Sequence, residues 1–163
     1  MKLLYFFMSA VLIFSANTVA NSTSSIAETT QNPHSICEQT IRAYPKLRDN
    51  GPVKDYGELF SQDSLFEVKK LGILLNGREE IKDRLSIALA TTKTHHIVND
   101  VHMSLLSEDT YQAKSFFTLT LLKLTEPKSA AMNITGHYQD VLHFDGKYCE
   151  IVSRQVNLDP QTP

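Results

Sequence analysis

The chain has 163 residues, of which 42% are hydrophobic and 21% are charged, and its formal net charge at pH 7 is −2. This length and composition are typical of one globular domain that can bury a sizeable core. The near balance of 16 basic and 18 acidic residues offers no basic surface for nucleic acid or for an anionic membrane, so we expect neither partner.

The first twenty residues, MKLLYFFMSAVLIFSANTVA, have an early charge at Lys2, an apolar run from Leu3 to Phe14 and small residues near their end. This pattern predicts a secretory signal peptide over residues 1–20, and hence a periplasmic or secreted protein. The alternative is an uncleaved anchor, although the run is short for a bilayer core of about 30 Å. Residues 21–33 are rich in Ser, Thr and Asn and predict a flexible leader. No later segment is apolar enough for stable membrane insertion after cleavage.

We place the folded domain at residues 34–158, beginning with two helices. In SICEQTIRAYPKL, Ile36, Ile41 and Tyr44 fall near one helical face, and Pro45 should end or kink that helix. The segment DNGPVKDYGELFSQD predicts a short second helix with Pro52 at its first position. Its apolar stripe consists of Val53, Tyr56, Leu59 and Phe60.

The next segment, SLFEVKKLGILLNG, predicts two short strands around a turn at residues 69–72. NGREEIKDRLSIALA then predicts a helix that Asn76 caps and that ends near Thr91. Its first turn holds two acidic residues, Glu79 and Glu80. Apolar residues recur every four positions along it, at Ile81, Leu85 and Leu89.

From residue 92 onward the pattern is that of long strands. THHIVNDVHMSLL, YQAKSFFTLTLLKL, NITGHYQDVLHF and KYCEIVSRQVNL follow one another, with a loop at Pro127, a hairpin turn at Asp145-Gly146 and a frayed tail at residues 159–163. Helices in the first half and antiparallel strands in the second indicate an α+β domain. A twisted sheet with helices on one face leaves a concave space in which small-molecule pockets form.

Two cysteines, Cys37 and Cys149, remain in the mature chain, and neither has the spacing of a redox or zinc motif. An oxidising compartment permits a disulfide between them, which would stabilise the fold by about 3 to 5 kcal/mol. The alternative is two buried free thiols.

Three histidines cluster in THHIVND and the residues that follow it. Strand alternation places His96 and His102 on one face and His95 on the other. His96 and His102 would lie about 20 Å apart along the strand, too far to bind one metal ion. We therefore expect no metal site here. His96 is the better candidate for a general base, because an imidazole can accept a substrate proton near neutral pH.

In GHYQDVLHF the residues Tyr138, Asp140, Leu142 and Phe144 share an apolar and hence inward face. His96, Tyr138 and Asp140 are thus the catalytic candidates, as base, hydrogen-bond donor and orienting carboxylate. The alternative is that Asp140 pairs with Tyr138 or Arg154 as a buried polar network.

Other side chains complete the predicted pocket. Arg154 is a candidate to bind a ligand carboxylate, and the alternative is that it forms a structural salt bridge. Tyr56 and Phe117 are candidates for ligand contacts, and the alternative is that they belong to the core. We expect His34, His137 and His143 at the surface. Asn21 and Asn133 match the glycosylation acceptor pattern, which matters only in a eukaryotic host.

Four segments resemble the SnoaL-like branch of the nuclear-transport-factor-2-like superfamily, in family order. They are YGELFSQDSLFEV, GREEIKDRL, HHIVNDVHMSLLSEDTYQAKSFF and GHYQDVLHFDGKYCEIVSRQV. The resemblance implies a cone-shaped α+β barrel, in which a strongly curved antiparallel sheet carries the N-terminal helices over its concave face. THHIVND matches the position of a catalytic histidine in the related scytalone dehydratase at His96.

Members with known chemistry act on small, mostly apolar organic molecules by proton transfer, without metal or organic cofactor. Turnover as a dehydratase, isomerase or cyclase is therefore one hypothesis for this chain, and plain binding of such a molecule is another. A third is assembly, because the open sheet face in this superfamily often forms homodimers. An exposed apolar row on the last strands would favour assembly, and here it comprises only Val141, Cys149 and Ile151.

Overall fold

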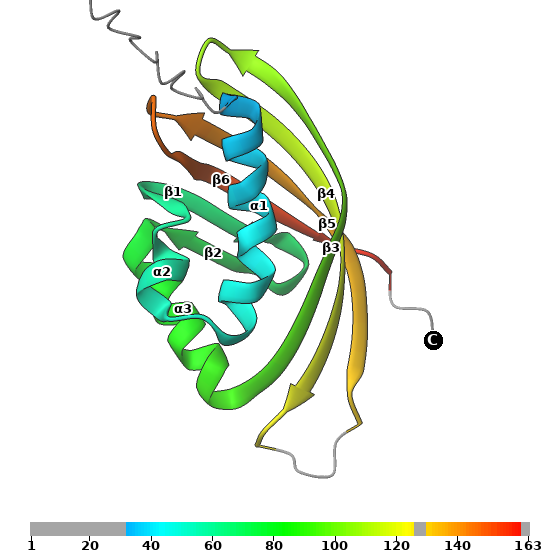
Figure 1. Ribbon diagram of the computed structural model, residues 1–163. Helices are drawn as coiled ribbons and strands as arrows, with labels where there is room; N and C mark the ends of the chain where they lie inside the picture. Colours follow the sequence, from blue (N-terminus) through cyan, green and yellow to red (C-terminus); the bar gives the residue numbers. More distant parts are fainter. Residues whose placement is uncertain (1–31, 126–129, 161–163) are drawn as a thin grey trace, which may run out of the picture. The chain divides into compact units, whose positions relative to one another are not determined.

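The computed structural model describes residues 32–125 and 130–160. Its helices are α1 (Pro33–Asn50), α2 (Val53–Gly57) and α3 (Arg78–Thr91), and its strands are β1 (Phe60–Val68), β2 (Ile73–Asn76), β3 (Thr92–Ser107), β4 (Thr110–Lys123), β5 (Met132–Phe144) and β6 (Cys149–Leu158) (Figure 1). The predicted signal peptide, nearly all of the leader and the loop at Pro127 lie outside the described residues. In the part described, no helix combines the length and the apolar character needed to cross a membrane.

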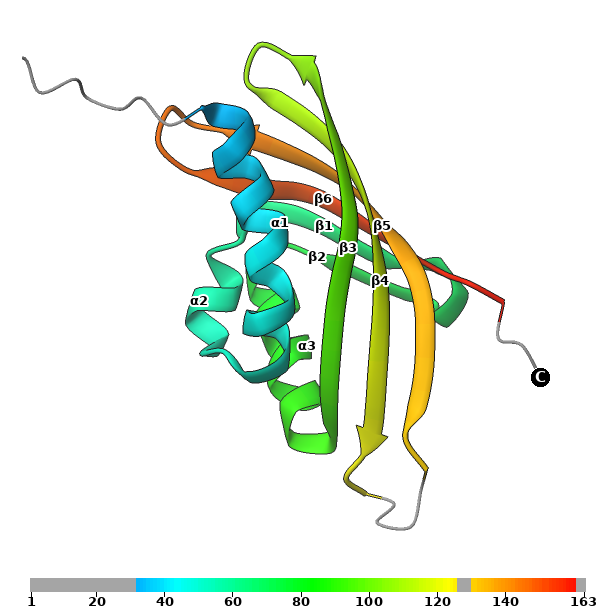
Figure 2. The same cartoon turned by 45° about the vertical axis from the view of Figure 1, so that its right-hand side comes forward.

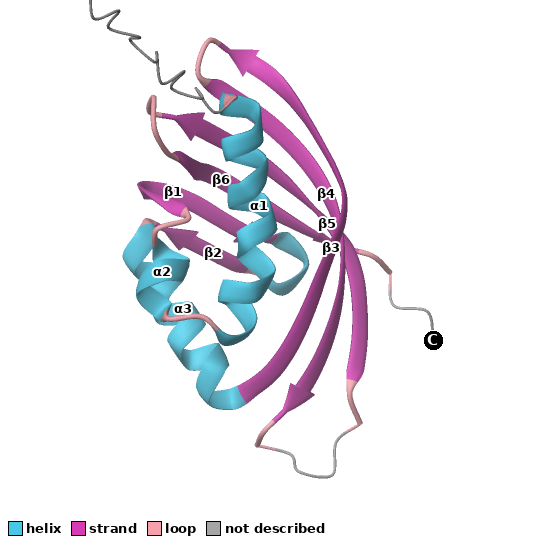
Figure 3. Ribbon diagram, in the orientation of Figure 1, coloured by secondary structure: helices cyan, strands magenta, loops and turns pink. Residues whose placement is uncertain are grey.

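One sheet holds the strands in the order β2-β1-β6-β5-β4-β3. β1 runs parallel to β6, with Phe60 opposite Ile151, while the other neighbouring pairs are antiparallel. The sheet is curled but not closed, and the helices cover its concave face, with α1 lying across the long strands (Figure 2 and Figure 3). The α+β class and the cone-like curl are therefore confirmed, and the sheet is mixed.

Helix α1 passes through Pro45 and ends at Asn50, so Pro45 does not end it. A proline inside a helix removes one hydrogen bond and costs about 3 kcal/mol. The turn after Pro45 is nevertheless held in place, because the buried carboxylate of Asp49 accepts hydrogen bonds from β3. At the other end the side chain of Asn32 caps the first turn.

The two shorter helices depart from prediction at their ends. α2 is shorter than expected, since Phe60 already begins β1. Asn76 does not cap α3, because it is the last residue of β2, where it pairs with Leu65 and donates its N–H to Glu80. Gly77, at φ 88°, takes the cap position instead. The predicted apolar face of α3 is buried at Ile81 and Leu85.

Two irregularities in the ladder shift the inward face of the sheet. β3 has a bulge between Asn99 and His102, where Asp100 adopts φ 47°. β6 has another between Ile151 and Ser153. A bulge inserts an extra residue and so reverses the alternation beyond it. The predicted exposed row on the last strands is wrong for this reason, since two of its three members are buried: Cys149 and Ile151.

A disulfide joins Cys37 of α1 to Cys149 of β6, with the two Cα atoms 4.9 Å apart. Both cysteines are buried, and the hydroxyl of Thr40 donates a hydrogen bond to the Cys149 carbonyl beside them. The bond links residues 112 positions apart in the sequence and so ties the first helix to the last strand. At the end of the domain, Asp159 is hydrogen bonded to Thr135.

Candidate functional site

A cavity of about 190 Å³ lies between the helices and the concave face of the sheet. Its walls are mostly apolar, with Phe66, Ile81 and Phe117 among them. The polar side chains that face it come from the three helices and from β3 and β5: Tyr44, Arg48, Tyr56, Arg84, His96 and Tyr138. Apolar walls with a few convergent polar groups are typical of sites for small molecules.

His96 lies on the inner face of β3 and forms a close pair with Asp49 from the last turn of α1. The His96 Nδ1 atom is 2.5 Å from Asp49 Oδ1, and the His96 backbone N–H donates to Asp49 Oδ2 at 2.6 Å. The hydroxyl of Thr94 donates to Asp49 Oδ1 at 2.7 Å. Both His96 and Asp49 are buried, so water has little access to the pair.

The state of Asp49 decides which nitrogen of His96 carries its proton. Burial raises the pKa of the Asp49 carboxyl, but the hydrogen bonds from His96 and Thr94 outweigh burial, and the net pKa is lowered. Asp49 is therefore ionised at neutral pH and can only accept hydrogen bonds. Nδ1 must therefore carry a proton, and in the uncharged form of the ring the lone pair lies on Nε2. An imidazole held in this way has the chemistry of a general base.

Three tyrosines gather beside this pair. The ring of Tyr44 lies 5.5 Å from that of Tyr56 and 5.4 Å from that of Tyr138, measured between ring centres. Burial, reinforced by Tyr44, raises the pKa of both Tyr56 and Tyr138 well above the ordinary value. These phenols stay protonated at neutral pH and can donate a hydrogen bond to a ligand oxygen. Two of the catalytic candidates, His96 and Tyr138, thus line one cavity.

The third candidate, Asp140, belongs to a separate cluster. Its carboxylate accepts two hydrogen bonds from Arg154, through Nε and Nη2, both at 2.7 Å. The two residues are direct partners in the β5–β6 ladder, so their side chains lie side by side on the same face of the sheet. The guanidinium also lies between the rings of Tyr44 and Tyr138, at 4.0 and 4.3 Å from their centres. The carboxylate that orients His96 is therefore Asp49, and the expectation that Asp140 does so is corrected.

The other histidines of β3 lie away from the cavity. His95 is exposed on the outer face, as expected. His102 was expected to share the face of His96, but the bulge before it turns it outward, where it is exposed opposite Lys114. Among residues 32–125 and 130–160, no three His, Cys, Asp or Glu side chains converge to hold a metal ion.

The remaining predicted residues divide between core and surface. Tyr56 and Phe117 belong to the buried core and also line the cavity. His143 is exposed as expected, whereas His34 and His137 are half-buried. These two pack against aromatic rings, with 6.1 Å between the ring centres of His34 and Tyr111.

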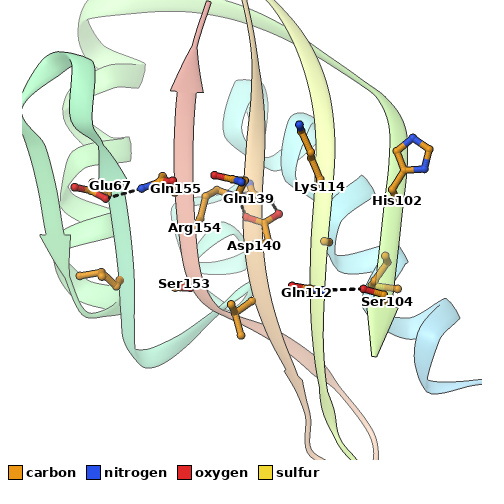
Figure 4. Close-up of a pocket in the computed structure, with 14 residues that line it drawn as sticks. Glu67, His102, Ser104, Gln112, Lys114, Gln139, Asp140, Ser153, Arg154 and Gln155 are labelled. Carbon is orange, nitrogen blue, oxygen red and sulfur yellow. Dashed lines mark hydrogen bonds and ion pairs between the residues drawn. The ribbon is translucent and has the colours of Figure 1, made fainter. Parts of the chain in front are cut away.

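A second, more open hollow of about 570 Å³ lies on the outer face of the sheet (Figure 4). One row of side chains crosses five strands there: Glu67, Gln155, Gln139, Lys114 and His102. A parallel row holds Leu65, Ser153, Val141, Gln112 and Ser104. Five of these ten side chains are amides or hydroxyls, which do not titrate near neutral pH. Acid–base chemistry is assigned to the inner cavity, because His96 is paired there with a carboxylate.

Sequence reasoning missed Asp49 and Arg48, because the first helix was expected to end or kink at Pro45. A signal was present in the helical spacing. Cys37, Ile41 and Tyr44 follow one face, and that face continues to Arg48 if the helix is extended by one turn. The inward position of Asp49 then depends on its hydrogen bonds to β3, which no local pattern reports.

The curled sheet, the helices over its concave face and the cavity between them define the cone-shaped α+β class. The SnoaL-like domain family matches residues 35–154, and the chain belongs to this family. No curated protein matches the chain.

Several solved structures share the fold at low identity. A Novosphingobium aromaticivorans protein provisionally named a scytalone dehydratase has a TM-score of 0.70 and 17% identity, over 79% of this chain and 85% of that one. ActVI-ORFA from Streptomyces coelicolor has a TM-score of 0.63 and 16% identity, over 77% and 96%. The β subunit of a provisionally named aromatic-ring-hydroxylating dioxygenase from N. aromaticivorans has a TM-score of 0.64 and 16% identity, over 78% and 90%.

Proposed function

We propose that this protein is exported and holds a small, mostly apolar organic molecule in the inner cavity, where His96 transfers a proton. The reaction class is that of a dehydratase, isomerase or cyclase that uses no metal or organic cofactor. The observation that carries the proposal is the buried His96–Asp49 pair in the wall of an apolar cavity. Membership of the SnoaL-like family supports small-molecule binding, and the apolar run in residues 1–20 supports export.

In this proposal each polar group has one role. Nε2 of His96 accepts a proton from a carbon or oxygen of the bound molecule, and Asp49 keeps the ring in the required tautomer. The phenol of Tyr138 donates a hydrogen bond to the oxygen on which negative charge develops. The apolar walls strengthen both interactions, because electrostatic forces are less screened away from water.

The test is hydrogen exchange at carbon. Cyclohexanone and cyclohexenone, whose single rings suit a small cavity, are incubated with the protein in D2O, and proton NMR follows the loss of the signals next to the carbonyl. The wild type should accelerate exchange, and His96→Gln should lower the rate by about 10²- to 10⁴-fold, the usual contribution of a general base. His95→Gln is the matched control, because that side chain is exposed on the opposite face of the same strand.

The two parts of the proposal can fail separately. If His96→Gln exchanges as fast as the wild type, His96 is not the base. If the ketones leave the amide signals of the cavity-lining residues unshifted at millimolar concentration, the cavity does not bind such molecules.

A second candidate function is assembly of two copies through the outer face. The row across the outer hollow is acidic at Glu67 and basic at Lys114, with Gln155 and Gln139 between them (Figure 4). A two-fold axis between the two glutamines would place Glu67 of one copy opposite Lys114 of the other. Such self-complementary charge is what an isologous dimer requires.

Charge exchange tests the assembly function. Sedimentation should show a dimer for the wild type, a monomer for Lys114→Glu, and a restored dimer for the double variant Glu67→Lys with Lys114→Glu. A monomeric wild type at high micromolar concentration would exclude assembly of this kind.

A further inference from the structure

The inner cavity carries more positive than negative charge. Arg48 from α1 and Arg84 from α3 both line it, and the lining side chains of the described chain include no Asp or Glu. Neither arginine forms a hydrogen bond or an ion pair within residues 32–125 and 130–160. Positive charge that faces an apolar cavity without a partner is unfavourable unless an anion neutralises it.

Arg48 is the more informative of the two arginines. Its Nη1 atom is buried and has no hydrogen-bond partner among the described residues. Buried polar groups are nearly always hydrogen bonded, so an unsatisfied guanidinium N–H indicates where a partner is required. Arg48, Tyr56 and Tyr138 all line the same cavity, so the guanidinium and the two phenols face a common ligand site.

The two buried acidic side chains of the described chain, Asp49 and Asp140, already have partners. Asp49 accepts hydrogen bonds from His96 and Thr94, and Asp140 accepts two from Arg154. Each of these carboxylates therefore has its own hydrogen-bond donors. Neither of them neutralises the positive charge of Arg48.

The size of the cavity limits the molecule. An apolar cavity of about 150 Å³ admits benzene. The volume of about 190 Å³ therefore allows one ring with a small substituent. The cavity offers apolar surface for the ring from β4 and β5, at Phe117, Leu119 and Ile134.

We propose that the ligand of the inner cavity is a one-ring organic carboxylate whose anionic group binds Arg48 and the phenol of Tyr56. This inference rests on the proposed function, since it requires that the inner cavity is the ligand site. It adds the charge of the ligand, which neither the fold nor the apolar walls specify. Arg84, at the exposed surface of α3, contributes a second positive charge for entry of the anion.

The experiment compares two probes of the same shape and different charge, benzoate and benzamide. Each is titrated into the isotope-labelled protein near neutral pH, and amide chemical shifts of the cavity-lining residues give the dissociation constants. Benzoate should bind at least tenfold more tightly than benzamide. Arg48→Gln should weaken benzoate binding by roughly tenfold to a hundredfold, the usual value of a hydrogen bond to a charged group, and leave benzamide unchanged.

Two further variants separate a specific contact from general attraction. Arg48→Lys keeps the charge and should retain most of the preference for benzoate. Arg42→Gln removes the same charge from the same helix, but Arg42 pairs with Glu38 and does not line the cavity, so it should change nothing. Arg48 forms no hydrogen bond or ion pair among residues 32–125 and 130–160, so its replacement breaks none of these interactions.

Each outcome gives a decision. If benzamide binds as tightly as benzoate, or if Arg42→Gln weakens benzoate as much as Arg48→Gln does, the anionic ligand class is refuted while the cavity remains a binding site. If neither probe shifts the lining residues at millimolar concentration, the carboxylate proposal is overturned. The ketone exchange experiment then decides separately whether the cavity binds neutral molecules.

Discussion

Removal of the Asp140 carboxylate should destabilise the protein strongly. In Asp140→Leu the guanidinium of Arg154, which is 1% exposed, would remain buried without its partner. Breaking a buried ion pair in this way costs about 3 to 5 kcal/mol. A domain of this size is stable by only about 5 to 15 kcal/mol, so the variant should lose a large part of its stability. Arg154→Met should have a similar effect, because it leaves a buried carboxylate instead.

The double variant Asp140→Leu with Arg154→Met should lie much closer to the wild type. Two apolar side chains of similar volume replace a buried pair at little net cost, since neither charge has to be taken out of water. Methionine also preserves contact with the rings of Tyr44 and Tyr138, between which the arginine lies. The two single costs should therefore exceed the cost of the double variant by several kcal/mol, which is the signature of a coupled pair.

The measurement is urea unfolding followed by circular dichroism, with all four proteins compared at one pH and salt concentration. Equal slopes of free energy against urea would show that the denatured states are comparable. A loss of less than about 1 kcal/mol for Asp140→Leu, the value of an exposed pair, would contradict a buried ion pair at this position. Losses of the single variants that simply add in the double variant would contradict coupling between the two residues.

Three further outcomes are expected from unfolding experiments. Reduction of the Cys37–Cys149 bond should lower the free energy of unfolding by about 4 to 5 kcal/mol, the entropic value for a loop of this length, and a double serine variant should not respond to reductant. Asp49 has a folded-state pKa below its unfolded value of about 3.9, so it stabilises the protein above that pH and loses this contribution as pH falls. The stability gap between wild type and Asp49→Asn should therefore narrow below about pH 4, and a constant gap would contradict this. Gly136→Ala should lower the free energy of unfolding by about 1 to 3 kcal/mol, because the added methyl group would overlap the carbonyl oxygen of Asn157. An unchanged urea midpoint would show that the two strands move apart to make room for the methyl group.

Most of the fold could be predicted because strand alternation and helical periodicity are local properties. The inward face of β5, with Tyr138, Asp140 and Leu142, was correct for this reason. His102 was assigned to the wrong face because a bulge reverses the alternation, and a bulge depends on how two strands pair. Residues on the far side of such a bulge cannot be placed from their own sequence.

The candidate site was only partly predictable, because its charged pairs join distant segments. His96 and Tyr138 were found from their own strands. Asp49 was not, since its position depends on a helix that continues past Pro45, which local propensity disfavours. Asp140 was expected to orient His96. Arg154 lies directly opposite Asp140 in the ladder, however, and donates hydrogen bonds to both of its carboxylate oxygens.

The parallel pairing of β1 with β6 has a consequence for the order of folding. β3, β4 and β5 join in sequence through antiparallel pairing, so their contacts can form early. β1 pairs locally with β2, but its contacts with β6 join segments far apart in the sequence, and such contacts form slowly. The helices that carry Tyr44, Arg48 and Asp49 complete the cavity only against this finished sheet. A ligand of the cavity would therefore recognise the final native state rather than a folding intermediate, and would slow unfolding more than it speeds folding.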